Sequence, residues 1–400
     1  MTSKANSRVL ICGAGPVGLT AALVLCRRGV PCIILERREQ LNTASKASTF
    51  HPPTLEILEE LGLLGQMLQQ GCLADRIQYR HVDGTVFAEF NQGILANDTR
   101  CPFRMHLEQS AITPLLLKNA LDTGLAEIRF GAEVVKVGTD ADGAWAELKD
   151  GSKFQGTYLI GTDGAHSVVR GSLGLSFAGE DYPGRVLRLM VRDDLNEFLP
   201  SVAGVSYLYT DDHRSISLLE MPDCWRVIIR VPDGISDETV MKPEWYSQVL
   251  EEFIPACKGR VDVIRTDIYS ASKMLAETNL VGRIALAGDA VHLTNTRGGM
   301  NMNCGIHDAY ILAAAIENAI QTGSHNQVQE AQQERLRVAR DELLPRTDRN
   351  VVGKEEWLAY ITDVAADEIK AREYLLGSSM IDISPSRMKV KDTAREGARG

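Results

Sequence analysis

Three glycines near the amino terminus have the spacing of a phosphate-binding turn. Gly13, Gly15 and Gly18 form a Gly-x-Gly-x-x-Gly pattern that includes Pro16, and Glu36 follows 18 residues after the last glycine. The first glycine of such a turn permits a tight bend, the second lets the backbone approach a pyrophosphate, and the third lets helix and strand pack closely. The positive end of the next helix would face the phosphates. An acid at this distance would accept ribose hydroxyls, so we expect an adenine-linked dinucleotide here.

The elements around this motif are those that a dinucleotide-binding fold needs. Residues 9–12 and 32–35 are short apolar runs typical of buried strands, and residues 19–28 between them predict an apolar helix. The order strand, glycine turn, helix, strand and acid is that of a Rossmann unit. The pattern returns late in the chain, where residues 281–286 predict a strand and 308–320 a long apolar helix.

The middle of the chain has a different pattern. Residues 205–209, 215–221 and 225–231 alternate between apolar and polar side chains, which predicts an antiparallel sheet. We therefore predict an α/β fold in which a Rossmann-like domain is interrupted by an antiparallel-sheet substrate domain and followed by a C-terminal helical layer. The predicted parts are 1–180 and 271–325 for the nucleotide domain, 181–270 for the substrate domain, and 326–400 for the helical region and its solvated basic tail.

The composition of the chain argues against several classes of function. The formal net charge of −10 argues against nucleic acid as a partner, because its recognition usually needs a basic surface. No run of 18 apolar residues exists, and the first residues are polar, so we expect neither a membrane span nor a secretory signal. The eight cysteines contain no C-x-x-C pair, which argues against a zinc site, and no metal is expected. We expect a cytoplasmic enzyme.

Two further motifs follow predicted strands. Asp163 lies in the sequence Gly-Thr-Asp-Gly-Ala-His after the predicted strand 158–160, and Asp289 lies in Gly-Asp-Ala-Val-His after 281–286. Together with the amino-terminal glycines, these motifs resemble the three signatures of the single-component FAD-dependent aromatic hydroxylases, the p-hydroxybenzoate hydroxylase-like family. The resemblance covers roughly residues 8 to 320, with the motifs in the family's order.

The resemblance implies which residues hold FAD. Asp163 would lie near the flavin and Asp289 would bind the ribityl chain, although either carboxylate could also cap a helix. Lys46 falls where the family carries an arginine near the pyrophosphate, and it could equally be a surface lysine. The complete set that the resemblance assigns to the cofactor is Gly13, Gly15, Pro16, Gly18, Glu36, Arg37, Lys46, Arg104, Gln109, Asp163, Asp289, Gly298, Gly299, Met302 and Asn303.

The chain departs from the family in the loop beside the flavin. Many members carry two prolines there, whereas this chain has Asn295 and Thr296. Their polar side chains could act on the reacting oxygen or substrate, or they could restore the loop through local side-chain to backbone bonds. We assign a candidate catalytic role to Thr296 and a candidate substrate role to Asn295.

A comparison of the predicted middle sheet with the family suggests which residues would contact the substrate. It places Tyr209 at the family's substrate-facing tyrosine, and Glu220 and Pro222 where the benzoate enzyme holds a carboxylate. The substrate is then a neutral phenol or related ring, or an acid bound in another pose. Arg226 and Arg230 share one face of their strand and could serve an anion, or could be solvated positions. Glu220 and Arg226 are candidate substrate residues.

The resemblance also implies a reaction. NADH or NADPH would reduce FAD, O2 would form a flavin C4a-hydroperoxide, and a phenolic or heteroaromatic ring would take up the distal oxygen. A phenol ionises only near pH 10, so the protein must help to remove its proton, and Tyr209 is the candidate relay. Epoxidation, oxidative decarboxylation and other flavin oxidations stay open as alternatives, as does a flavin fold without redox chemistry. A homodimer is a family-level expectation.

Overall fold

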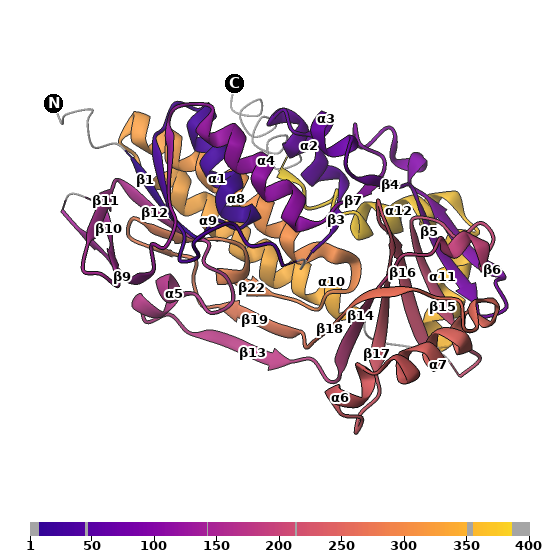
Figure 1. Cartoon of the computed structure of the whole chain (residues 1–400). Helices are drawn as coiled ribbons and strands as arrows, with labels where there is room; N and C mark the ends of the chain where they lie inside the picture. Colours follow the sequence, from indigo (N-terminus) through magenta and orange to yellow (C-terminus); the bar gives the residue numbers. More distant parts are fainter. Residues whose placement is uncertain (1–7, 45–46, 142, 213, 350–354, 386–400) are drawn as a thin grey trace.

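The computed structural model describes residues 8–44, 47–141, 143–212, 214–349 and 355–385 (Figure 1). Lys46 and the basic tail lie outside these residues. No helix in the described part of the chain is long and apolar enough to cross a membrane.

A six-stranded sheet forms the first half of the molecule. Its neighbouring strands pair in parallel, except for the antiparallel pair at the edge that β20 and β21 form. The inner strands are buried along their whole length, as a sheet covered on both faces requires. The strand order is β20 (Leu280–Val281), β21 (Ile284–Leu286), β12 (Tyr158–Gly161), β1 (Val9–Cys12), β2 (Cys32–Leu35) and β8 (Ala126–Arg129).

Helices cover one face of this sheet and a small antiparallel sheet covers the other. The helices are α1 (Pro16–Arg27), α4 (Gln109–Leu121) and α8 (Met300–Thr322), and their apolar residues form one core with the sheet. Alternate strand residues point to the opposite side and pack against β9 (Val134–Asp140) and β10 (Gly143–Leu148), which pairs with β11 (Lys153–Gly156). The short helix α5 (Val168–Ser172) follows β12.

A seven-stranded sheet forms the second half, on the right in Figure 1. All its neighbours are antiparallel except β15 and β5, which run in parallel. Helices α6 (Asp237–Val240) and α7 (Pro243–Phe253) cover its outer face. The strand order is β18 (Val263–Tyr269), β14 (Arg185–Val191), β17 (Trp225–Val231), β16 (Ser215–Glu220), β15 (Val205–Tyr209), β5 (Arg76–His81) and β6 (Val86–Asn91).

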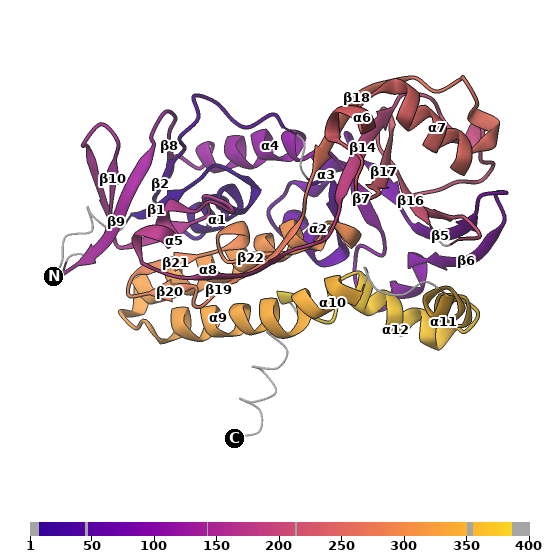
Figure 2. The same ribbon diagram turned by 90° about the horizontal axis from the view of Figure 1, so that it is seen from below.

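Short sheets and helices join the two halves. One small sheet contains β3 (Thr49–Phe50), β7 (Arg104–His106) and β4 (Cys72–Ala74), and another contains β13 (Phe177–Asp181), β19 (Ser272–Ala276) and β22 (His292–Leu293). Helices α2 (Pro52–Glu60) and α3 (Leu64–Leu68) follow β3. The last helices, α9 (Asn326–Arg337), α10 (Leu344–Arg349), α11 (Glu355–Ala365) and α12 (Glu368–Ser378), run beside both halves (Figure 2).

The predicted fold class is confirmed, with differences in detail. The strands predicted at 9–12, 32–35, 205–209 and 225–231 have the observed bounds. Helix α8 begins eight residues before the predicted start at 308, because its first turns carry buried polar side chains rather than an apolar stripe. The proposed domain boundaries at residues 180 and 270 stay predictions. They assign β5 and β6 to the nucleotide domain, whereas both strands pair in the seven-stranded sheet.

Candidate active site

A cavity of about 1040 Å³, here called the central cavity, extends between the two halves of the molecule. Residues of the glycine turn line one part of it, and residues of the seven-stranded sheet line another. Most of the residues predicted to hold the cofactor lie in its wall. They are Gly13, Gly15, Pro16, Glu36, Arg37, Arg104, Gln109, Asp163, Asp289, Gly298, Gly299 and Met302.

The glycine turn has the predicted local geometry. Helix α1 begins at Pro16, whose missing N–H is no loss in a first turn. Gly13 has a φ of +104°, and a Cβ there would lie 2.6 Å from the Thr162 carbonyl oxygen. A Cβ on Gly18 would lie 2.1 Å from the Gly13 oxygen, whereas a Cβ on Gly15 would meet nothing within 4 Å. Gly18 therefore allows the turn to pack tightly because it has no side chain, and Gly15 leaves open space in the cavity.

Glu36 closes the turn from the end of β2. One of its carboxylate oxygens accepts a hydrogen bond from the Ala14 N–H at 2.8 Å, and the other accepts from the Arg38 N–H at 3.0 Å. One donor belongs to the glycine turn and the other to the segment after β2, and together they hold the carboxylate at the cavity wall. This is the position in which an acid can meet the ribose of an adenosine.

Asp163 both caps a helix and lines the cavity. Its carboxylate accepts hydrogen bonds from the Ser167 hydroxyl at 2.6 Å and from the Val169 N–H at 3.1 Å, at the start of α5. The capping interpretation left open by the sequence is thus observed, and the carboxylate still faces the space where a cofactor would lie.

Asp289 is tied to a buried chain of polar side chains. Its carboxylate accepts a hydrogen bond from the Asn301 amide at 2.8 Å, and the Asn301 oxygen lies 2.8 Å from His292 Nδ1. His292 Nε2 lies 2.9 Å from the Asp308 carboxylate, which also accepts from Arg335 Nε at 2.7 Å. The chain therefore connects the cavity wall to a charge cluster inside the molecule.

The charged groups of this cluster stabilise one another's ionised forms. Burial disfavours an ionised Asp308, but Arg335 and His292 outweigh it, and the pKa of Asp308 is lowered. Burial likewise opposes a charged His292, but Cys304 and Asp308 outweigh it and raise the pKa of His292 well above its ordinary value. A doubly protonated His292 donates through Nδ1 to the Asn301 oxygen, which turns the Asn301 amide toward Asp289.

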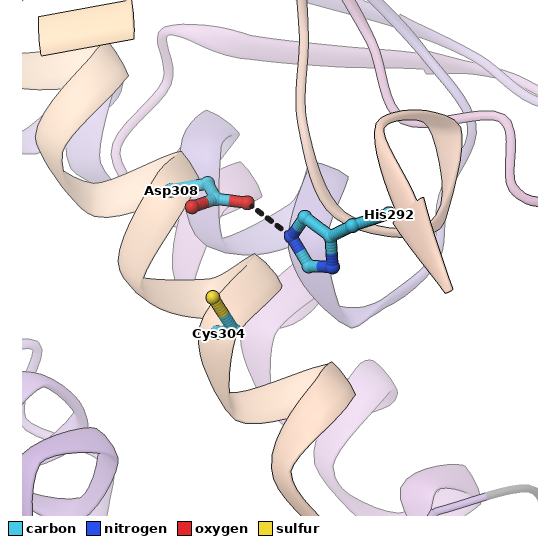
Figure 3. Close-up of side chains that lie close together, drawn as sticks. All are labelled: His292, Cys304 and Asp308. Carbon is cyan, nitrogen blue, oxygen red and sulfur yellow. Dashed lines mark hydrogen bonds and ion pairs between the residues drawn. The ribbon is translucent and has the colours of Figure 1, made fainter. Parts of the chain in front are cut away.

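The same cluster has the composition of a metal site. His292, Cys304 and Asp308 offer ligand atoms within 4.8 Å of one another, and Figure 3 shows the three side chains converging. Arg335 already donates to the Asp308 carboxylate and, at 3.0 Å, to the Cys304 sulfur. A divalent cation would face this guanidinium, so the cluster is better described as an ion network.

The glycine loop before α8 is anchored by Asn303. The Asn303 amide donates to the carbonyls of Thr49 at 2.8 Å and Gly299 at 2.7 Å, and its oxygen accepts from the His51 N–H at 2.9 Å. Gly298 and Gly299 both have positive φ values, +81° and +64°, so the loop favours glycine at both positions. Asn303 itself is fully buried and does not line the cavity, so it positions the loop from behind.

Asn295 and Thr296 lie in the cavity wall but differ in their bonding. The Asn295 amide donates to the Thr347 carbonyl at 2.6 Å, and its oxygen accepts from the Arg297 N–H at 3.0 Å. Asn295 thus restores the loop through side-chain to backbone bonds, as one of the two interpretations expected. Thr296 is exposed, and its hydroxyl lies 3.3 Å from the Tyr269 hydroxyl.

The seven-stranded sheet presents a mainly apolar floor to the cavity. Val205, Tyr207, Ser217, Leu219 and Ile228 all line it. Sequence reasoning missed Tyr207. Its signal was present, since alternation places Tyr207 and Tyr209 on the same face of β15.

Tyr209 is not among the residues that line the central cavity, and its substrate-facing role stays a prediction. It packs instead in a core between the sheet and helix α11. Burial raises the pKa of the Tyr209 phenol, so this group keeps its proton at neutral pH. Strand alternation correctly places Tyr207 and Tyr209 on the same face of β15, but it could not show which of the two lines the cavity.

Glu220 also lies away from the cavity. Its carboxylate accepts a hydrogen bond from the Gly204 N–H at 3.2 Å, and its carbonyl accepts from His106. These bonds fix the end of β16, and the substrate role of Glu220 stays a prediction. Arg226 does line the cavity, but it is buried and donates to Glu108 at 2.7 Å and to the Ser48 hydroxyl at 2.6 Å.

Arg104 and Gln109 approach the cavity from the small sheet and from the start of α4. Arg104 is buried and donates through Nη2 to the Ser378 carbonyl at 2.9 Å. Its Nε is buried without a hydrogen-bond partner among the described residues, and burial lowers the pKa of Arg104. A buried donor left unpaired at a cavity wall fits a site that receives a polar ligand.

Comparisons with known proteins agree with this site. A family model described as an FAD binding domain matches residues 6–343. A para-nitrophenol 4-monooxygenase from Pseudomonas sp. is 29% identical over 79% of each chain, and a 6-hydroxy-3-succinoylpyridine 3-monooxygenase from Pseudomonas putida is 26% identical over 92% of this chain and 97% of the relative. The crystal structure of a p-nitrophenol 4-monooxygenase from Pseudomonas putida superposes with a TM-score of 0.86 at 26% identity, covering 94% of this chain and 98% of that one.

The chain therefore belongs to the FAD-binding family of single-component aromatic hydroxylases, and it is a FAD-dependent monooxygenase. The residues present fit FAD. The open space at Gly15, the positive φ of the Gly298–Gly299 loop and the unpaired donor of Arg104 all lie in one cavity wall. The roles of the individual cofactor residues remain predictions.

Proposed function

We propose that this enzyme uses NADH or NADPH and O2 to hydroxylate a neutral phenolic or heteroaromatic ring in the central cavity. The observation that carries the proposal is the continuity of the cavity, which joins the dinucleotide fingerprint to the apolar floor of the seven-stranded sheet. The relatives named for nitrophenol and hydroxypyridine oxidation support the same class of substrate.

The chain's own residues would hold FAD at both ends. The glycine turn and the start of α1 would receive the pyrophosphate, and Glu36 the adenosine ribose. Asp289, oriented by Asn301, would receive the ribityl chain, and the backbone of Gly298 and Gly299 would border the flavin ring. The oxygen-activating chemistry comes from the bound FAD, while the protein supplies orientation and electrostatics.

The charge balance of the floor favours a neutral ring. The two buried arginines at its edge are each paired with an acid, because Arg188 donates to Asp267 at 2.9 Å and Arg226 to Glu108 at 2.7 Å. Between them the floor offers Leu219 and Ile228, which exclude water without adding charge. A phenol or hydroxypyridine fits this floor better than a ring that carries its carboxylate directly.

Tyr207 is the hydroxyl best placed to help a phenolic substrate lose its proton. It lines the cavity from the middle of β15, and its ring lies 5.0 Å from that of Tyr79, measured between ring centroids. Tyr79 in turn hydrogen-bonds Tyr374 with a distance of 3.0 Å between the two hydroxyl oxygens. We assign Tyr207 the role of holding the substrate hydroxyl.

The test is turnover of the FAD-loaded enzyme on a panel of neutral phenols and hydroxypyridines. NADH and NADPH consumption, hydroxylated product and hydrogen peroxide are measured together. We expect one substrate class to accelerate consumption and to give product with little peroxide. If no compound in a broad panel changes the rate, or if all oxygen appears as peroxide, the proposal fails.

A matched pair of variants tests the role of Tyr207. Tyr207→Phe should lower the rate of hydroxylation by about 100-fold, a typical contribution of a positioned proton-transfer group, and should move the pH profile toward the ionisation of the free phenol. Tyr209→Phe, two residues along the same strand but outside the cavity wall, should leave both unchanged. Equal effects of the two substitutions would contradict the assignment.

A further inference from the structure

The buried histidine of β22, His292, meets a polar partner at each of its two ring nitrogens. Its side chain is 1% exposed. Nε2 lies 2.9 Å from the Asp308 carboxylate (Figure 3), and Nδ1 lies 2.8 Å from the side-chain oxygen of Asn301. The proposed ring hydroxylation makes no use of this histidine.

The partners of Asn301 fix the direction of its side-chain amide. The amide nitrogen lies 2.8 Å from the Asp289 carboxylate and 3.3 Å from the His292 carbonyl oxygen, and both of these groups only accept hydrogen bonds. An amide turned the other way would bring its oxygen against these two acceptors. The nitrogen of Asn301 therefore points at Asp289, and its oxygen points at His292 Nδ1.

The same reasoning places a proton on each ring nitrogen of His292. Nδ1 faces the Asn301 oxygen, which is an acceptor, so Nδ1 donates. Nε2 faces Asp308, whose two carboxylate oxygens also accept from Arg335 Nε at 2.7 Å and from the Gly288 N–H at 3.3 Å. Asp308 is therefore an ionised acceptor, and Nε2 donates to it. A ring that donates from both nitrogens is a cation.

Charges of opposite sign alternate along this series of side chains. Arg335 and His292 are cations on either side of the Asp308 carboxylate, and Asn301 connects His292 to Asp289. The side chains of His292 and Asp308 are 1% and 4% exposed, so salt and water screen their interaction little. The His292 charge thus holds the Asn301 dipole with its positive end toward Asp289.

We propose that Asn301 is a positioning residue, which transmits the charge of His292 to Asp289 and so fixes the Asp289 carboxylate toward the flavin half of FAD. Asp289, Asn301 and His292 are here called the positioning chain. The proposal rests on the proposed function for one point, the assignment of Asp289 to the ribityl chain. Ribityl hydroxyls donate hydrogen bonds, and a carboxylate held in one direction accepts them without further ordering.

The experiment compares two ligands that share the ADP half of FAD. FAD and ADP are titrated by calorimetry into the full-length chain after its FAD has been removed. Asn301→Ala should weaken FAD binding at least about tenfold, the order expected for one hydrogen bond to a charged group, and should leave ADP binding at the wild-type value. A parallel loss of ADP affinity would show that Asn301 supports the fold in general, and it would overturn the proposal.

A double-mutant cycle tests whether His292 acts through Asn301. His292→Gln should weaken FAD binding in the wild-type background, because a neutral amide neither carries the charge nor donates in both directions. In the Asn301→Ala background the same substitution should add little, since both residues belong to one series of hydrogen bonds. Fully additive losses would contradict the positioning chain. Asn301→Gln, which keeps the amide, should recover part of the FAD affinity.

The charge of His292 has a spectroscopic signature. In the wild-type holoenzyme, the ¹⁵N NMR signals of His292, assigned by their loss in His292→Gln, should show a proton on each ring nitrogen. A neutral ring would overturn the proposal. Asn318→Ala is the matched control for the titrations, because Asn318 lies on the same helix but outside the cavity wall, and its FAD and ADP affinities should both be wild type.

Asp289→Asn separates failure of the positioning chain from failure of the proposed function. If Asp289→Asn loses FAD affinity but Asn301→Ala and His292→Gln do not, the positioning chain is refuted and the assignment of Asp289 stands. Wild-type FAD affinity in Asp289→Asn would overturn both. A selective loss of FAD affinity in all three variants supports the positioning chain, whether or not a phenolic ring is hydroxylated.

Discussion

Gly15 and Gly18 belong to one motif, yet a methyl group would have opposite consequences at the two positions. A Cβ on Gly18 would collide with the Gly13 oxygen and the Thr162 hydroxyl, whereas a Cβ on Gly15 would project into open space in the cavity. The sequence motif predicts this difference, because its second glycine would admit a pyrophosphate and its third would allow close packing, although the family resemblance assigns both glycines to the cofactor. In the structure, Gly18 permits the close packing of the turn, whereas Gly15 leaves space for a ligand.

This division predicts the behaviour of Gly15→Ala. The apoprotein should unfold at the wild-type temperature, because nothing lies within 4 Å of the added methyl group. FAD affinity should fall at least about tenfold, a loss of about 1.4 kcal/mol of binding free energy, because the pyrophosphate can no longer approach the backbone. Gly171→Ala, which also meets nothing within 4 Å but lies outside the cavity wall, is the control. Wild-type FAD affinity in Gly15→Ala would contradict the account.

At the scale of elements, helix α8 shows what the sequence could and could not reveal. Its apolar second half was predicted from periodicity, but its first turns contain Asn301, Asn303, His307 and Asp308, whose polarity is typical of a loop. Asn303, His307 and Asp308 are buried because each of them meets a partner on another element of the fold. Strand alternation likewise identified the cavity face of β15 but not which of its two tyrosines reaches the cavity.

The anchoring of α8 gives a prediction about stability. Asn303→Leu removes the partners of three backbone groups, the His51 N–H and the carbonyls of Thr49 and Gly299. Since an unsatisfied buried group costs about 1–3 kcal/mol, urea denaturation should show a loss of at least about 2 kcal/mol in the free energy of unfolding. Asn119→Leu, whose amide donates only to a carbonyl of its own helix, should lose much less. Equal losses would show that Asn303 is no anchor.

At the scale of the molecule, three buried histidines are held neutral. Burial lowers the pKa of His106 to about 4 and of His307 to about 3, and it lowers the pKa of His51 well below its ordinary value. Below pH 6.5 the unfolded chain therefore binds more protons than the folded one, so stability falls as the pH falls. His292 has a raised pKa and is protonated in both states in this range, so it adds no slope there.

This balance predicts acid-sensitive stability between pH 6.5 and about 4. Each of the three histidines contributes up to about 1.4 kcal/mol per pH unit to the decline in the free energy of unfolding. His106→Asn, whose amide can still donate to the Glu220 carbonyl, should reduce the slope by about one histidine's share. His166→Asn, at an exposed position, should leave it unchanged. A slope that is the same in wild type and His106→Asn would refute this origin.

The most direct test of the central claim is the fate of molecular oxygen. The FAD-loaded enzyme is supplied with NADH or NADPH, the best phenolic or hydroxypyridine substrate and ¹⁸O2, and the product is analysed by mass spectrometry. The account predicts one ¹⁸O atom in each molecule of hydroxylated product. Product that carries oxygen only from water would contradict the assignment of this cavity to a monooxygenase reaction.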